Sequence, residues 1–164
     1  MSDKKSLCCS FTGHRRIAAE RVRVMNETLA SAIAFAYSRG VRTFLAGGAL
    51  GFDTYAAKAV ILFRMTHPDV RLVLLLPCKD QDAKWTDAER AEYAFVLKSA
   101  DEIEYISENY TDDCMRERNR ALASRADMLI AYVTRSRSGA AQTLRMAEAL
   151  KKETYNIAVR VDKA

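Results

Sequence analysis

Short apolar runs alternate along this chain with longer segments in which apolar residues recur every three or four positions. The apolar runs predict six strands, at residues 7–12, 43–46, 71–77, 102–107, 128–133 and 155–161. The helical spacing predicts five helices, at residues 21–39, 52–67, 86–100, 114–125 and 139–151. The run Leu72–Leu76 has no polar alternation, which is typical of a strand buried on both faces.

Helix-end signals agree with these boundaries. Gly40 stands where a helix C-cap is expected, and Pro68 stops the second helix. Thr86 and Glu89 have the spacing of a capping box at the start of the third helix.

Strands that alternate with helices predict right-handed crossovers and a parallel sheet between two helical layers. We therefore expect an α/β fold, a single Rossmann-like three-layer sandwich over residues 1–164, with a mostly parallel sheet of about six strands. In such folds ligands bind outside the carboxyl ends of the strands.

Composition narrows the functional classes. A chain of 164 residues, 49% of them hydrophobic, can bury a full core, and no apolar run approaches the roughly 20 residues needed to cross a bilayer. With no signal-peptide pattern after Met1, we expect a cytoplasmic protein without membrane contact. The four cysteines and two histidines have no metal-ligand spacing, so we expect no metal and no cofactor. The net charge of +5 suits an anionic ligand.

The glycine-rich stretch Gly47–Asp53 joins the second strand to the second helix. A strand that leads through glycines into a helix N-terminus can bind phosphate, because the first helical N–H groups are unpaired. The stretch can equally be a tight turn that needs glycine and binds nothing.

Other polar groups follow strands that end at the same edge. The candidate ligand-binding residues are Thr12, Gly13, His14, Arg15, Gly47, Gly48, Gly51, Asp53, Arg118, Asn119, Ser138, Gly139 and Thr143. Two helix N-termini and an arginine fork together favour a phosphate site, although each residue alone is better explained as a cap or a solvated loop residue.

Three positions allow more than one role. Asn119 shares an apolar helix face with Met115 and Leu122, so its amide either ties down a loop or reaches the ligand. Asp53 can cap its helix, bind a ribose hydroxyl, or do both. Trp85 and Tyr110 are loop aromatics that can cover a base or simply pack.

The chain resembles the SLOG superfamily of Rossmann-like domains, and within it the YpsA-like proteins. The likeness rests on four motifs: Phe11-Thr12-Gly13-His14-Arg15, Gly47-Gly48-Ala49-Leu50-Gly51-Phe52-Asp53, the segment 110–119, and the segment 127–133 followed by Ser138-Gly139-Ala140-Ala141-Gln142-Thr143. The resemblance implies a nucleotide-derived ligand, and its relatives include DprA, which loads recombinase on single-stranded DNA, and the LOG phosphoribohydrolases.

The chain departs from these relatives at the last glycine turn. It has Ser138-Gly139-Ala140 where the family usually has Gly-Gly-Thr, and it lacks the glutamate that the LOG enzymes need for cleavage.

Three functions follow as hypotheses. The first is a sensor or regulatory module that binds a nucleotide or a phosphoribosyl or ADP-ribose-like compound. The second is an N-glycosidic hydrolase, for which Asp53 and Glu108 are the candidate catalytic residues. The third is single-stranded nucleic-acid binding, which is not favoured because the basic segments lack interleaved aromatic residues. A homodimer would cover the edges of an open sheet.

Overall fold

The computed structural model describes residues 6–163. Its strands are β1 (Leu7–Gly13), β2 (Val41–Ala46), β3 (Arg71–Leu76), β4 (Glu102–Tyr105), β5 (Met128–Tyr132) and β6 (Glu153–Asn156). Its helices are a short 3-10 turn η1 (Ala19–Arg21), α1 (Val22–Ser38), α2 (Phe52–Arg64), α3 (Asp87–Ser99), α4 (Cys114–Arg125), α5 (Gly139–Ala149) and α6 (Ala158–Asp162). None of these helices is both long and apolar enough to cross a bilayer.

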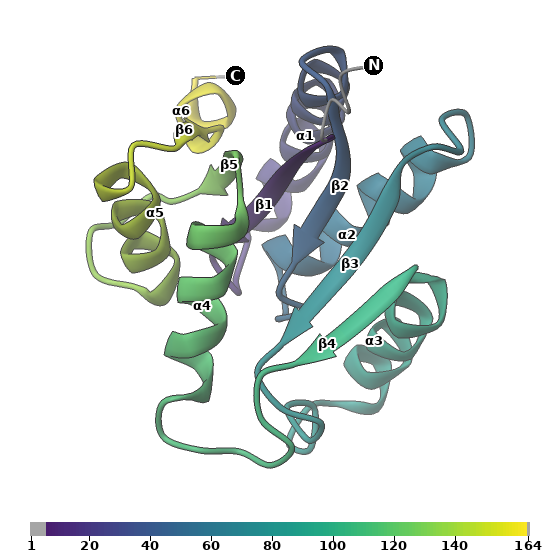
Figure 1. The fold of residues 1–164 in the computed structure, drawn as a ribbon, viewed down its shortest axis with the longest axis vertical. Coiled ribbons are helices and arrows are strands. Elements are labelled where there is room, and N and C mark those ends of the chain that lie inside the picture. The colour runs from purple at the N-terminus through teal and green to yellow at the C-terminus, as the bar shows by residue number, and fades with distance from the viewer. Residues whose placement is uncertain (1–5, 164) are drawn as a thin grey trace, which may run out of the picture.

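The six strands form one sheet in the order β4-β3-β2-β1-β5-β6, and every neighbouring pair is parallel. Helices α1, α2 and α3 cover one face, α4 and α5 cover the other, and α6 packs on α1 (Figure 1). The predicted α/β Rossmann-like sandwich is confirmed, with a sheet that is wholly parallel.

The core lies on both faces of the sheet. On the α1–α2 side Phe11 stacks on Phe44, with ring centroids 5.8 Å apart, and meets Phe52 edge-on at 6.4 Å. The α4 side is a smaller cluster that joins Leu45, Val73 and Leu75 to Leu122. The residues of β3 after Arg71 are all buried, as the unbroken apolar run predicts.

Thr86 and Glu89 form the predicted capping box at the start of α3. The Thr86 hydroxyl accepts a hydrogen bond from the backbone N–H of Glu89 at 3.2 Å, and the Glu89 carboxylate accepts one from the Thr86 N–H at 2.9 Å.

The C-terminal prediction of one strand at 155–161 is wrong. Strand β6 ends at Asn156, whose side-chain oxygen accepts the N–H of Val133 at 3.0 Å and that of Ala158 at 3.3 Å. After it, the buried Ile157 is the N-cap of the short helix α6, and Ala158 and Val161 are buried within that helix at helical spacing.

Candidate functional site

A cavity of about 470 Å³ opens at the carboxyl ends of β1 and β5. From β1 the chain continues through α1 on one face to β2, whereas β5 continues through α5 on the opposite face to β6. The cavity therefore lies at the point where the winding of the sheet reverses, which is where α/β folds bind ligands. Its walls come from the loop after β1, the start of α2, the inner face of α4 and the loop between β5 and α5.

The structure brings nine of the thirteen predicted ligand-binding residues to this cavity. They are Thr12, Gly13, His14, Arg15, Asp53, Arg118, Asn119, Ser138 and Gly139. The other four, Gly47, Gly48, Gly51 and Thr143, are not among the cavity-lining residues. The candidate catalytic residue Glu108 is exposed, forms an ion pair with Lys79 at 3.1 Å, and likewise does not line the cavity.

The glycines of the first turn allow close packing behind the cavity wall. A Cβ on Gly47 would lie 2.7 Å from Arg118 Nη1 and 2.9 Å from Asp53 Oδ2. Gly51 has φ +76°, and a Cβ there would lie 2.2 Å from the Arg15 carbonyl oxygen. The N–H of Phe52, the first residue of α2, donates to the His14 carbonyl at 3.0 Å. This turn joins α2 to the loop after β1, and its first helical N–H is already used.

Asp53 and Arg118 place opposite charges on the cavity wall. Asp53 is 6% exposed and Arg118 is 4% exposed. Asp53 does not cap α2, because its Oδ2 accepts the N–H of Ala49 at 3.2 Å. Arg118 Nη1 donates to the Gly47 carbonyl at 2.6 Å, and its Nε donates to Asn119 Oδ1 at 2.8 Å.

Burial controls the ionisation of both groups. It raises the pKa of Asp53 to about 6, although the charges of Arg118 and Arg15 and the N–H of Ala49 act in the opposite direction. Burial likewise lowers the pKa of Arg118, and the charge of Asp53 opposes this shift. A buried carboxyl that titrates near neutral pH, in a cleft, marks a candidate functional group.

Helix α4 presents Arg118 rather than Asn119 as its buried polar residue. The sequence pattern placed Asn119 on the apolar stripe, but Asn119 is half-buried. Its Oδ1 accepts from Arg118, so its amide nitrogen is left as the donor on the cavity side, 3.5 Å from where a Cβ on Gly139 would lie. Both alternatives for Asn119 therefore hold in part, since it orients a neighbour and also lines the cavity.

His14 is held in one tautomer. Its Nε2 accepts the backbone N–H of Thr134 at 2.8 Å, so in the neutral ring the proton is on Nδ1. Burial, with a smaller contribution from Arg135, lowers the pKa of His14 and favours this neutral form. Within residues 6–163 the Nδ1 atom has no hydrogen-bond partner.

The start of α5 provides the open backbone donors. Ser138 is the N-cap, and its hydroxyl accepts the N–H of Ala141 at 3.0 Å. Helix geometry leaves the N–H groups of Gly139 and Ala140 without intrahelical acceptors, and both residues line the cavity. Thr143 supports this turn from inside, because it is fully buried and donates to the Gly139 carbonyl at 2.9 Å.

Six lining residues were absent from the predicted set: Arg16, Ala49, Met115, Leu122, Arg135 and Ala140. Arg135 lies in the loop after β5, and Met115 and Leu122 lie on the apolar face of α4, so their positions in the predicted fold could have identified them. Trp85 packs edge-on against Tyr93 at 5.1 Å, whereas Tyr110 is 62% exposed beside the smaller cavity formed with Arg15 and Cys78.

Comparison with known sequences gives a match over nearly the whole chain. A family model described as the YspA SLOG family matches residues 12–162. A UPF0398 protein of Halalkalibacterium halodurans is 32% identical over 102 residues, which are 61% of this chain and 54% of that protein. The SPbeta prophage-derived protein YoqJ of Bacillus subtilis is 28% identical over 124 residues, which are 68% of this chain and 70% of that protein. This chain therefore matches only about half the length of the UPF0398 protein.

Two solved structures share the fold. DNA processing protein A (DprA) from Streptococcus pneumoniae superposes with a TM-score of 0.66 and 15% identity, over 91% of this chain and 49% of that one. DprA from Helicobacter pylori gives 0.63 and 22%, over 90% of this chain and 63% of that one. The structural likeness to the two DprA proteins concerns the fold alone. The sequence match from residue 12 to residue 162 establishes that the chain belongs to the YpsA family of SLOG proteins.

Proposed function

We propose that the cavity binds a nucleotide or a nucleotide-derived compound of the phosphoribosyl or ADP-ribose type, and that the protein acts as a sensor or regulatory module. One observation carries the proposal: cationic side chains and the open end of α5 face the same cavity as a single buried carboxyl group. This combination matches a ligand with an anionic part and a hydroxyl-bearing part.

The phosphate belongs at the start of α5. There the N–H groups of Gly139 and Ala140 and the positive end of the helix dipole face the cavity. Arg15 and Arg135 line the same space and provide planar forks for phosphate oxygens. The start of α2 is a poorer phosphate-binding site, since the N–H of Phe52 already donates to the His14 carbonyl.

The ribose belongs beside Asp53. An ionised carboxylate accepts two hydroxyl hydrogen bonds, as recognition of the vicinal hydroxyls of ribose requires. The amide nitrogen of Asn119 provides a donor between this carboxylate and the phosphate seat. Met115 and Leu122 give the α4 wall an apolar surface against which a base can pack.

Isothermal titration with ribose 5-phosphate, AMP and ADP-ribose tests the proposal, with uncharged adenosine as the reference ligand. We expect at least one phosphorylated compound to bind at millimolar concentration or below. The double change Arg15→Gln and Arg135→Gln should weaken this binding by roughly tenfold or more, because each charged hydrogen bond contributes about 1.5–3 kcal/mol. Arg23→Gln removes one charge at an exposed position on α1 and should leave binding unchanged. Absence of binding to all three compounds would refute the proposal.

A second candidate function is hydrolysis of the N-glycosidic bond of such a ligand. The observation that favours it is Asp53, a buried carboxyl in the cavity with its pKa raised to about 6, which suits general acid–base chemistry near neutral pH. Asp53 would take a proton from water as the water oxygen attacks C1′ and the C1′–N bond breaks, its electron pair leaving with the base nitrogen. The proton held by Asp53 would then pass to that nitrogen, which regenerates the carboxylate. Release of free base from AMP, abolished by Asp53→Asn, would establish this activity.

A further inference from the structure

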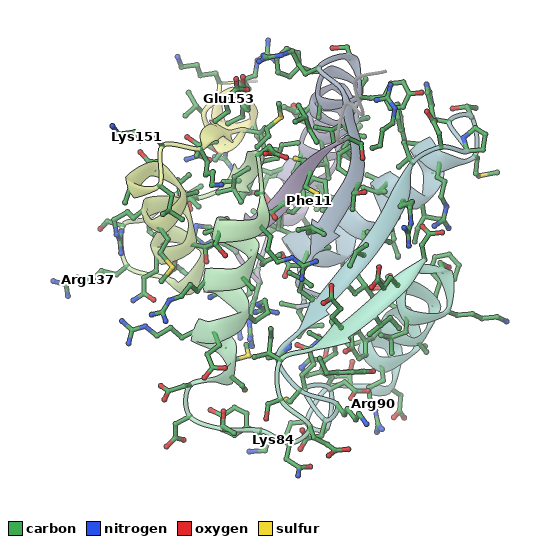
Figure 2. The ribbon with its side chains drawn as sticks, viewed as in Figure 1. Phe11, Lys84, Arg90, Arg137, Lys151 and Glu153 are labelled. Carbon is green, nitrogen blue, oxygen red and sulfur yellow. The ribbon has the colours of Figure 1, made fainter. Side chains whose placement is uncertain are left out.

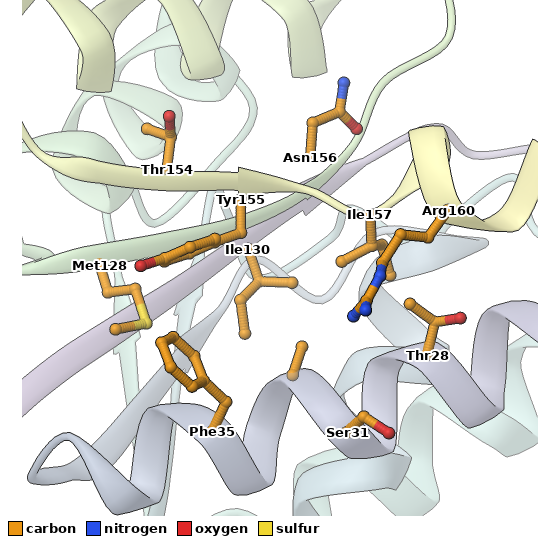
Figure 3. A pocket seen from close by; sticks show the side chains of 11 residues that line it. Thr28, Ser31, Phe35, Met128, Ile130, Thr154, Tyr155, Asn156, Ile157 and Arg160 are labelled. Carbon is orange, nitrogen blue, oxygen red and sulfur yellow. The ribbon is translucent and has the colours of Figure 1, made fainter.

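A second cavity, of about 490 Å³, lies on the face of the sheet that α1 covers, near the C-terminus. It is bounded by α1, by strands β5 and β6, and by helix α6 (Figure 3). It shares no lining residue with the cavity between β1 and β5. Its volume is in the range of pockets that bind small organic molecules, about 300–1,000 Å³.

The floor and one end of this cavity are apolar. Met128, Ile130 and Ile157 are at most 5% exposed and form its floor. Phe35 and Tyr155 meet edge-on at one end, with ring centroids 5.4 Å apart (Figure 3). Phe35 is 42% exposed, so part of its ring is open to the cavity and to solvent.

The other end is polar and cationic. The side chain of Arg160 extends from α6 toward α1, at the end of the cavity that Thr28 and Ser31 also line (Figure 3). Among residues 6–163 no carboxylate lies within ion-pair distance of Arg160.

The nearest acidic residues in sequence are already engaged. Asp162 forms an ion pair with Arg21. Glu153 forms one with Arg39 at 2.8 Å and accepts a hydrogen bond from the Tyr155 hydroxyl at 3.1 Å. The guanidinium of Arg160 is therefore available to an acid from outside the chain.

We infer that this cavity is a second ligand site, which takes a small molecule with an apolar body and one carboxylate group. The apolar body would lie on Met128 and Ile130 against the two rings, and the carboxylate would pair with Arg160. A guanidinium fork fits the two oxygens of a carboxylate. A phosphate is a poorer match, because this end of the cavity offers one arginine and no long-helix N-terminus. This inference does not rest on the proposed function.

Titration with 4-phenylbutyrate and with its neutral amide tests the inference. We expect the carboxylate to bind roughly tenfold or more tightly than the amide, since only the carboxylate can pair with Arg160. Arg160→Gln should reduce the affinity for the carboxylate to that of the amide, whereas Arg23→Gln, the same change elsewhere on the surface, should not. Methyl NMR should show the largest shifts at Met128, Ile130 and Ile157.

Ala32→Leu provides an independent variant, because Ala32 lines the cavity from α1 and a larger side chain would fill it. We expect it to abolish binding of both probes in a folded protein. The inference is overturned by no binding to the wild type, by equal affinity in Arg160→Gln, or by shifts confined to residues 12–16 and 134–140. It is also overturned if sedimentation shows a dimer that Ala32→Leu dissociates, because a second copy of the chain would then occupy the groove.

Discussion

At the residue scale, the burial of the Asp53 carboxyl predicts how the free energy of unfolding depends on pH. Its pKa is raised to about 6 in the folded protein from the ordinary value of 3.8. The native state therefore holds this proton more tightly than the unfolded state does. The contribution of Asp53 to the free energy of unfolding is complete below about pH 4 and is lost as the pH rises through about 6. The loss is on the order of 3 kcal/mol.

Asp53→Asn cannot titrate, so the difference between wild type and variant isolates this effect. Urea unfolding of both proteins from pH 4 to pH 7 should show the wild type losing free energy of unfolding relative to the variant over that range. A carbon-13 NMR titration of the Asp53 carboxyl provides the second measurement. A difference that stays constant with pH would contradict the prediction.

The sequence predicts which segments form the site better than it predicts which side chain of α4 is the buried polar one. Asn119 fits the apolar stripe of α4, yet Arg118 is the buried residue. Helical spacing does place Arg118 on the inner face of α4, because Cys114 and Leu122, four residues before and after it, are also buried. What the sequence does not reveal is the polar partner that a buried arginine needs, the Gly47 carbonyl, which lies 71 residues earlier in the chain. The hydrogen bond depends on the tertiary fold and leaves no local pattern.

At the element scale, the two glycine turns look equivalent in sequence and differ in space. A Cβ on Gly51 would clash with the Arg15 backbone, and its φ of +76° disfavours any side chain. A Cβ on Gly139 would meet only the Asn119 amide, at an ordinary 3.5 Å. The glycines of the first turn are therefore required for packing, whereas Gly139 of the second turn lines the cavity.

This difference predicts opposite effects of the same substitution. Gly51→Ala should lower the free energy of unfolding by roughly 2 kcal/mol or more, because both strain and a backbone clash oppose it. Gly139→Ala should raise it by about 0.5–1 kcal/mol, since alanine restricts the unfolded chain and fits the helix. Urea unfolding of both variants measures this, and equal destabilisation would contradict the assignment of the two turns.

The sequence predicts element boundaries well for the strands that are buried on both faces of the sheet, and poorly at the C-terminus. The runs of β3 and β5 are buried along almost their whole length, so their pattern is unambiguous. The last apolar segment was wrongly predicted as one strand, because an apolar run of that length fits a strand or a short helix equally. The side chain of Asn156 decides the outcome, since it bonds both polar groups of Val133 and ends the strand.

At the scale of the whole molecule, ion pairs and the candidate site are segregated. Ten ion pairs join residues within 6–163, and none of them includes a residue that lines the cavity between β1 and β5. Arg15, Arg16 and Arg135 are exposed there, and none of them has a described carboxylate within ion-pair distance. Arg137, in the loop between β5 and α5, points outward from the molecule (Figure 2). Cationic side chains without an ion-pair partner therefore line the cavity where an anion would bind.

The positive charge of these arginines predicts that the affinity for an anionic ligand falls as the salt concentration rises. Raising the salt concentration from about 0.05 M to about 0.5 M shortens the screening length severalfold, so the affinity for ADP-ribose should fall by roughly tenfold. Any affinity for adenosine should not change, because adenosine carries no charge. Arg16→Gln should flatten the salt dependence, whereas Arg23→Gln should not, since Arg23 is already paired with Glu27 at 3.0 Å. A single-stranded oligonucleotide distinguishes the alternative: if it displaces ADP-ribose with a much steeper salt dependence, this edge takes nucleic acid, because each released counterion adds to the slope.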